Sequence, residues 1–241
     1  MPLPKIDVIT HTAVIPSTNE EVLLRPFLVK EQKILLTAVA GNDPLEMSAA
    51  VKQVINNCVV TPGFDVEKVE VFDLEYLMLQ LRTISVGETT KISFYGVEDS
   101  NCDECKESRV VEINLKDVKV DMSGKIDPKI ALTDTVGVFM RYPTHKEIAK
   151  FSKTQSEPNA ELKLLWSCIE SVYDAESIVS TKDVTVDEGM QFLESLTTKQ
   201  FAEVEKFLQN MPKLTYEVNL TCGKCGTKQS TTLTGLETFL G

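Results

Sequence analysis

The residues with the clearest capacity for chemistry are four cysteines in two C-x-x-C pairs. Cys102 and Cys105 stand in SNCDECKE, and Cys222 and Cys225 stand in LTCGKCGT. A tight C-x-x-C turn can bring two thiolates to one ion about 2.3 Å away, and a closed structural zinc site takes four such ligands. If the two turns meet, we expect one zinc site with these four cysteines as its ligands. Such a site has no open coordination position, so its role would be structural.

The two turns differ in how well they suit a metal. Gly223 and Gly226 allow the backbone of the second turn to curl around an ion with positive φ. The first turn contains no glycine, and Asp103 and Glu104 add negative charge beside its thiolates. The second turn is therefore the better supported half of the predicted zinc site.

Two alternatives for the cysteine pairs stay open: a redox site, and hairpin turns that hold no metal. A thioredoxin-like C-x-x-C needs a strand before it and a helix after it. Both pairs here are followed by strand-like sequence, which argues against redox chemistry. Cys58 and Cys168 lie in apolar helical runs, so we expect them to be inert core thiols.

Composition excludes several classes of protein. Hydrophobic residues make up 42% and charged residues 25% of the 241 residues, as in soluble globular proteins. A net charge of −11 argues against binding to nucleic acid or anionic membranes. No apolar run approaches the roughly 18 residues of a membrane span, and the beginning of the chain lacks the apolar stretch of a signal peptide. In a reducing cytosol, C-x-x-C pairs indicate metal or redox chemistry more often than disulfides.

The sequence contains few residues and no motif that would support catalysis. It has only two histidines, His11 in the N-terminal segment and His145 near a predicted helix start. We expect both to be solvated or to cap a helix. No phosphate-binding loop, dinucleotide fingerprint, nucleophile elbow or H-E-x-x-H motif is present. We therefore predict no catalytic residues and no small-molecule substrate.

Hydrophobic periodicity indicates the elements that would position the cysteines. Apolar residues recur at helical spacing, with Asp43–Pro44 and Asp73 as expected helix starts. The predicted helices cover residues 29–40, 44–60, 72–85, 161–174, 187–196 and 198–211. Alternating strand patterns flank each cysteine pair and predict two β-hairpins. Their strands cover residues 89–97 and 109–121, then 214–220 and 228–236.

These elements predict an α+β fold with a helical N-terminal half and a helical insertion. The two C-x-x-C β-hairpins would form a zinc-ribbon-like element. We expect five parts: an extended N-terminal arm (1–19), a helical region (20–88), the first hairpin (89–121), a mainly helical insertion (122–212) and the second hairpin (213–241).

Three motifs in order resemble a known family. They are RPFLVKEQKILL at 25–36, DLEYLMLQLR at 73–82, and the first C-x-x-C hairpin with its EINL, and YEVNLTCGKCG extends the likeness. The resemblance is to the baseplate proteins of T4-type contractile-tailed bacteriophages, specifically the hub subunit or hub assembly protein. It implies a non-enzymatic protein that binds other tail or baseplate hub proteins. Its expected location is the virion baseplate or, during assembly, the host cytoplasm.

A zinc-ribbon nucleic-acid-associated accessory protein is the alternative function. Ribbon tips that touch nucleic acid carry basic and aromatic residues. One tip here is Asp103–Glu104, and the other offers only Lys224 and Lys228. A thiol oxidoreductase is a third hypothesis.

Overall fold

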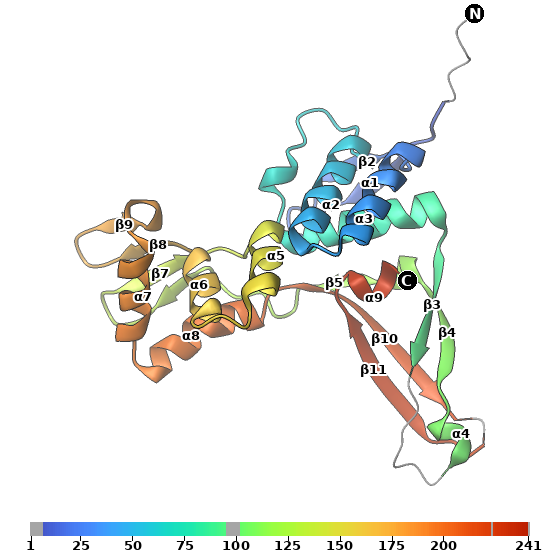
Figure 1. Cartoon of the computed structure of the whole chain (residues 1–241). Helices are drawn as coiled ribbons and strands as arrows, with labels where there is room; N and C mark the ends of the chain where they lie inside the picture. Colours follow the sequence, from blue (N-terminus) through green and yellow to red (C-terminus); the bar gives the residue numbers. More distant parts are fainter. Residues whose placement is uncertain (1–6, 95–101, 223, 241) are drawn as a thin grey trace, which may run out of the picture. The chain divides into compact units, whose positions relative to one another are not determined.

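The computed structural model describes residues 7–94, 102–222 and 224–240 (Figure 1). Contacts divide the chain into two compact units. The first unit comprises Met1–Ile34, Lys52–Asp121 and Lys213–Gly241, and the second comprises Leu35–Val51 and Met122–Pro212. Within the described residues, no helix is both long and apolar enough to span a bilayer. The five-part division expected from the sequence stays a prediction.

The first unit begins with a small antiparallel sheet of β1 (His11–Val14) and β2 (Glu21–Leu24). Part of the segment expected to be an extended arm is therefore a paired strand, and residues 1–6 of that segment lie outside the described chain. Alternate residues of β2, Val22 and Leu24, are buried, and Ala13 is the buried residue of β1.

Three helices follow near their predicted positions: α1 (Val29–Gly41), α2 (Pro44–Cys58) and α3 (Val71–Val86). The Asp43 carboxylate accepts from the Leu45 amide at 2.8 Å, which supports the predicted start of α2. The predicted cap of α3 is wrong: Glu70 occupies the N-cap position, and Asp73 is buried in the first turn. Apolar side chains of α3 form much of this unit's core, among them Phe72, Leu74, Leu77, Leu79 and Leu81.

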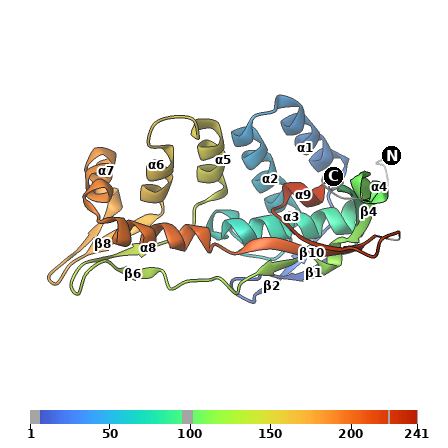
Figure 2. The same cartoon turned by 90° about the horizontal axis from the view of Figure 1, so that it is seen from below.

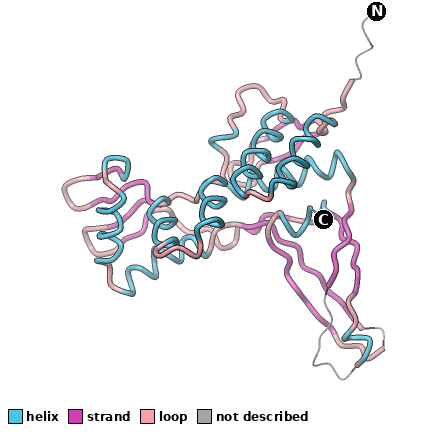
Figure 3. The backbone as a smooth tube through the Cα atoms, in the orientation of Figure 1, coloured by secondary structure: helices cyan, strands magenta, loops and turns pink. Residues whose placement is uncertain are grey.

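Both predicted C-x-x-C hairpins are present (Figure 3). The first pairs β3 (Thr89–Phe94) with β4 (Arg109–Asn114), and the second pairs β10 (Lys213–Thr221) with β11 (Lys228–Thr234). Short helices accompany them: α4 (Asp103–Lys106) in the first turn and α9 (Glu237–Leu240) after the second hairpin.

The segment 109–121, expected to be one strand, breaks after Asn114. The Asn114 side chain accepts from the Lys116 amide and caps the short 3-10 helix η2 (Leu115–Asp117). The chain then continues as β5 (Lys119–Asp121), which pairs with β10 and not with β3. A further 3-10 helix, η1 (Val66–Lys68), precedes α3.

The second unit contains a four-stranded antiparallel sheet in the order β6, β7, β8, β9. Its strands are Lys129–Ala131, Gly137–Met140, Ile169–Tyr173 and Ile178–Ser180. The predicted helix over 161–174 is wrong in its second half, because α6 ends at Ser167 and β8 follows. Ile169 and Val172 pair with β7, and this sheet pairing outweighs the helical spacing of the apolar residues.

The remaining helices of this unit are α5 (His145–Thr154), α6 (Ala160–Ser167), α7 (Val186–Ser195) and α8 (Thr198–Gln209), with the 3-10 helix η3 (Thr181–Asp183). Capping boxes headed by Thr144, Thr185 and Thr197 start α5, α7 and α8. Helix α5 packs against α6, and α6 against α7 (Figure 2). The mixture of helices and sheets agrees with the predicted α+β class.

Candidate metal centre

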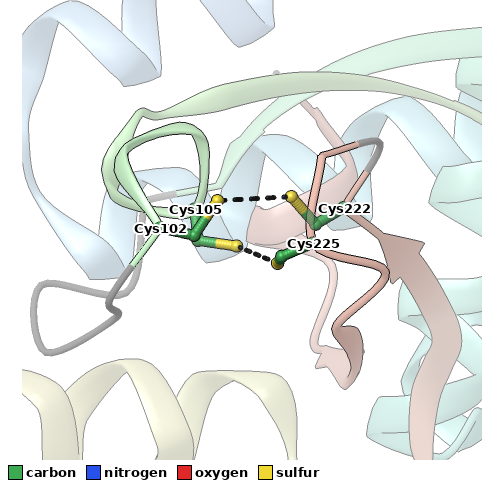
Figure 4. A group of neighbouring side chains, drawn as sticks. All are labelled: Cys102, Cys105, Cys222 and Cys225. Carbon is green, nitrogen blue, oxygen red and sulfur yellow. Dashed lines mark hydrogen bonds between the residues drawn. The ribbon is translucent and has the colours of Figure 1, made fainter.

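The four cysteines of the two C-x-x-C pairs come together in the first unit. Their sulfur atoms all lie within 4.8 Å of one another, and Figure 4 shows them between the two turns. The Sγ atoms of Cys102 and Cys222 are 3.9 Å apart, and those of Cys105 and Cys225 are 3.5 Å apart. These distances are far longer than the roughly 2.05 Å of a disulfide bond. The cluster therefore consists of four thiols.

Local backbone hydrogen bonds shape each turn. The Cys105 amide donates to the Cys102 carbonyl at 3.0 Å, which closes the first turn. In the second turn, the Cys222 amide donates to the Thr227 carbonyl at 2.9 Å, and the Gly226 amide donates to the Cys222 carbonyl at 3.0 Å. Gly226 has φ of 70°, so the positive φ expected at this glycine is present. Gly223 lies outside the described residues.

Strand pairing brings the two turns together across a long stretch of sequence. Strand β5 follows the first hairpin after the short helix η2. Its residues Lys119 and Asp121 pair with Thr215 and Lys213 at the start of β10. The second hairpin thus begins beside the end of the first one. Sequence alone did not reveal this pairing, because a three-residue strand carries almost no periodic signal.

The spacing of the sulfurs suits a tetrahedral ion. Four sulfurs that each lie 2.3 Å from a central zinc are about 3.8 Å from one another. The observed separations of 3.5 and 3.9 Å lie on either side of this value. A search of the histidine, cysteine, aspartate and glutamate side chains of the described residues finds these four cysteines close enough together to hold a metal ion. A set of four sulfur donors is complete and leaves no position for a substrate.

Hydrogen-bond donors around the second pair favour the thiolate form. The pKa of Cys222 is lowered to about 6, first by the backbone amide of Cys225 and then by the Arg109 side chain and the Lys224 amide. The pKa of Cys225 is lowered mainly by the Thr227 hydroxyl, whose oxygen lies 3.1 Å from the sulfur. Thiolates are the form that binds metals. Arg109 was missed in the sequence because nothing there marks its side chain as a partner of Cys222.

The other two cysteines have a different environment. Cys58 and Cys168 are fully buried, and burial raises their pKa values to about 11 and about 12, respectively. Neither sulfur belongs to the cluster. Their environment agrees with the expectation of inert core thiols.

The two histidines lie outside the cysteine cluster. His11 is an exposed residue of β1. His145 is neither a cap nor simply solvated, because Thr144 caps α5 and the His145 Nδ1 atom lies 2.7 Å from Ser48 Oγ. The expectation for His145 was wrong because its partner stands 97 residues away in the chain.

Comparison with known proteins identifies the family. A family described as T4 bacteriophage base plate protein matches residues 8–241, essentially the whole chain. The chain belongs to this family, so it is a structural protein of a phage baseplate that works among other tail or baseplate proteins. No curated protein and no solved structure matches the chain.

Proposed function

We propose that this chain is a structural or assembly protein of the hub of a contractile-tailed bacteriophage baseplate. It acts by binding other hub proteins, without catalysis, in the virion baseplate or in the host cytoplasm during assembly. The observation that carries the proposal is the family match over residues 8–241. The RPFLVKEQKILL and DLEYLMLQLR segments support the hub in particular, because they resemble hub subunits or hub assembly proteins.

We also propose that Cys102, Cys105, Cys222 and Cys225 hold one structural zinc ion. The sulfur spacing and the lowered pKa values of Cys222 and Cys225 support this assignment. The bound ion would join the tips of the two hairpins into a zinc-ribbon-like element. Because the four sulfurs complete the coordination of the metal, its contribution is to stability and not to a reaction.

Co-expression with the other hub proteins of the same phage tests the first proposal. We expect a complex that survives size-exclusion chromatography. Failure to associate with any baseplate protein would contradict the hub assignment. Salt-dependent binding to DNA or RNA would instead favour the nucleic-acid-associated alternative.

Metal analysis of the purified chain tests the second proposal. We expect one zinc ion per chain in the native protein and none in the double variant Cys222→Ser, Cys225→Ser. The matched control is Cys58→Ala, which removes a thiol outside the cluster and should keep the zinc. If the wild-type protein contains no metal even when zinc is present in all purification buffers, the assignment is wrong. Two partly occupied zinc sites per chain would also contradict it.

A further inference from the structure

Strand β1 of the first unit has one paired edge and one open edge. Its residue Thr12 lies opposite Leu23 of β2. On the far side of β2, the Leu23 carbonyl accepts from the Val60 amide at 2.8 Å, and the Leu23 amide donates to the Thr61 hydroxyl at 2.7 Å. Within the described residues, no strand pairs with the other edge of β1.

The hydrogen bonds of Leu23 fix the direction of the backbone groups of Thr12. Because the N–H and C=O groups of Leu23 both point away from β1, Thr12 and Leu23 form a non-hydrogen-bonded pair of the antiparallel ladder. The N–H and C=O groups of Thr12 therefore point towards the open edge. Those of Val14 do the same, because backbone directions alternate along a strand. The open edge thus presents hydrogen-bond donors and acceptors to an added strand.

The sequence of β1 does not protect this edge. Natural proteins protect exposed sheet edges with lysine, proline or a β-bulge. Residues 11–14 read HTAV, and their register with β2 runs without a shift from His11–Leu24 to Val14–Glu21. Thr12 and Val14 are exposed and β-branched, which favours strand pairing. The edge is therefore well suited to bind another strand.

A cavity of about 620 Å³ lies beside β1, between this strand and the end of α3, and both elements belong to the first unit. The residues that line it from these two elements include His11, Thr12, Ala13, Ile84, Ser85 and Val86. Side chains of an added strand would point alternately to the two faces of the sheet. Those on the same face as Ala13 would point towards the cavity.

Charges beside the edge indicate which strand would fit. Glu20 and Glu21 are exposed, and neither carboxylate forms an ion pair or hydrogen bond with another described residue. Glu21 lies opposite Val14 and shares its face of the sheet. The last turn of α3 has no basic residue, so its carbonyl groups leave a partial negative charge at the cavity. Glu88 and Lys116, which also line the cavity, form an ion pair with each other.

These charges favour a basic strand over a second copy of this chain. A second copy paired through its own β1 would bring another Glu20 and Glu21 to the same edge. Each chain also carries a net charge of −11, so two copies repel one another. A strand with lysine or arginine side chains instead complements both the two glutamates and the end of α3.

We propose that the open edge of β1 binds an extended, basic segment of another baseplate protein as an added strand. The backbone of this segment pairs with Thr12 and Val14. Its side chains lie alternately beside Glu21 and in the cavity next to α3. In strand addition, backbone hydrogen bonds supply affinity and the alternate side chains supply specificity. This inference rests on the proposed function, since it names the surface by which the chain binds a neighbouring protein.

The first test removes one backbone donor from the edge. The full chain is titrated against each purified baseplate protein of the same phage. Thr12→Pro deletes the amide that points to the open edge and keeps the hydrogen bonds between β1 and β2. We expect roughly tenfold weaker binding to one of these proteins, because a carbonyl of the added strand loses its donor. The matched control Thr12→Ala keeps the amide and should bind as the wild-type chain does.

A second test addresses the charge. Glu21→Lys should weaken the same complex, and more at low salt than at high salt. The matched control is Glu205→Lys in α8, which makes the same change of charge at another exposed residue and should leave binding unchanged. In the wild-type complex, amide hydrogen exchange at Thr12 and Val14 should slow, because both amides become hydrogen-bonded.

Circular dichroism and thermal melting first establish that each variant is folded, and if Thr12→Pro is not, Glu21→Lys and hydrogen exchange decide the question. If the wild-type chain binds a baseplate protein and the folded edge variants bind it equally well, the inference is wrong while the proposed function stands. If the wild-type chain binds no baseplate protein, the proposed function fails and the inference fails with it. Self-association that is lost in Thr12→Pro would assign the edge to a second copy of this chain and overturn the proposed partner.

Discussion

The Sγ atoms of Cys105 and Cys225 lie 3.5 Å apart although 120 residues separate them in the chain. A cross-link across so long a loop removes much conformational freedom from the unfolded chain. Within the first unit, the cysteine centre joins two hairpins whose bases already meet where β5 pairs with β10. A metal ion at this centre would therefore stabilise an arrangement that the backbone already favours.

Loss of the metal should lower stability measurably. A covalent cross-link over a loop of about 100 residues contributes roughly 4–5 kcal/mol, and we expect the zinc centre to contribute on the order of 4 kcal/mol. For a protein of this size, that corresponds to a fall in Tm of roughly 8–16 °C. Thermal melting of the wild-type chain before and after chelation measures this fall in Tm, with the Cys222→Ser variant as the metal-free reference. A Tm that chelation leaves unchanged would show that the centre stabilises nothing.

Thiol reactivity should separate the six cysteines into two classes. In the chelated protein, Cys225 is exposed and its pKa is lowered, so it should react first with a thiol reagent at pH 7.5. Cys58 and Cys168 are fully buried with pKa values of about 11 and about 12, so they should react only after unfolding. Mass spectrometry of the labelled peptides identifies each site. Rapid native labelling of Cys168 would contradict this picture.

Sequence patterns were informative where the signal is local. The strands on both sides of each C-x-x-C pair predicted the two hairpins, and four cysteines in two similar turns predicted the cluster. The start of α2 followed from Asp43–Pro44, because capping depends on a few neighbouring residues.

The remaining features depend on partners far away in the chain. Residues 169–173 have helical spacing but form β8, since β7 offers them a pairing edge. Asp73 was expected to cap α3, yet it lies buried and accepts a hydrogen bond from the Ser17 amide at 3.1 Å.

The two ion pairs Arg25–Glu31 and Arg141–Glu147 should differ in their contribution to stability. Glu31 is fully buried beside Arg25, whereas the Glu147 side chain is 26% exposed. Glu31→Gln leaves Arg25 largely buried without its counter-charge, so we expect a loss of about 3–5 kcal/mol. Glu147→Gln should cost about 1–2 kcal/mol, because water reaches that pair and glutamine can still complete the cap of α5. Denaturant unfolding gives the free energy of unfolding of each variant. Equal losses of stability in the two variants would contradict the role of burial.

Glu75 should make stability depend on pH. Burial, and then the Glu237 carboxylate, raises the pKa of Glu75 from 4.5 to about 7. The folded state therefore holds the Glu75 proton more tightly than the unfolded state does. This contribution to stability is full below about pH 4.5, falls as the pH rises towards 7 and is lost above it, with a total change of about 3 kcal/mol.

The variant Glu75→Gln should remove this part of the pH dependence and raise stability at pH 8. Unfolding in urea at several pH values between 5 and 8 measures the difference from the wild-type chain. Glu205, an exposed residue of α8, provides the matched control Glu205→Gln. A difference between Glu75→Gln and wild type that stays constant over this range would contradict the assignment.

Gly189 permits close packing between α6 and α7 in the second unit. A Cβ atom at this position would overlap the indole ring of Trp166, which is buried and cannot move without disturbing the core. We expect Gly189→Ala to destabilise the protein by about 1–3 kcal/mol, despite the better helix propensity of alanine. The matched control is Gly41→Ala at the end of α1, where a Cβ atom would meet only the flexible carboxylate of Glu46. That side chain can turn away, so the control should be close to neutral in thermal melting. If both alanine variants melt at the wild-type temperature, the contact between Gly189 and Trp166 does not limit the packing of these helices.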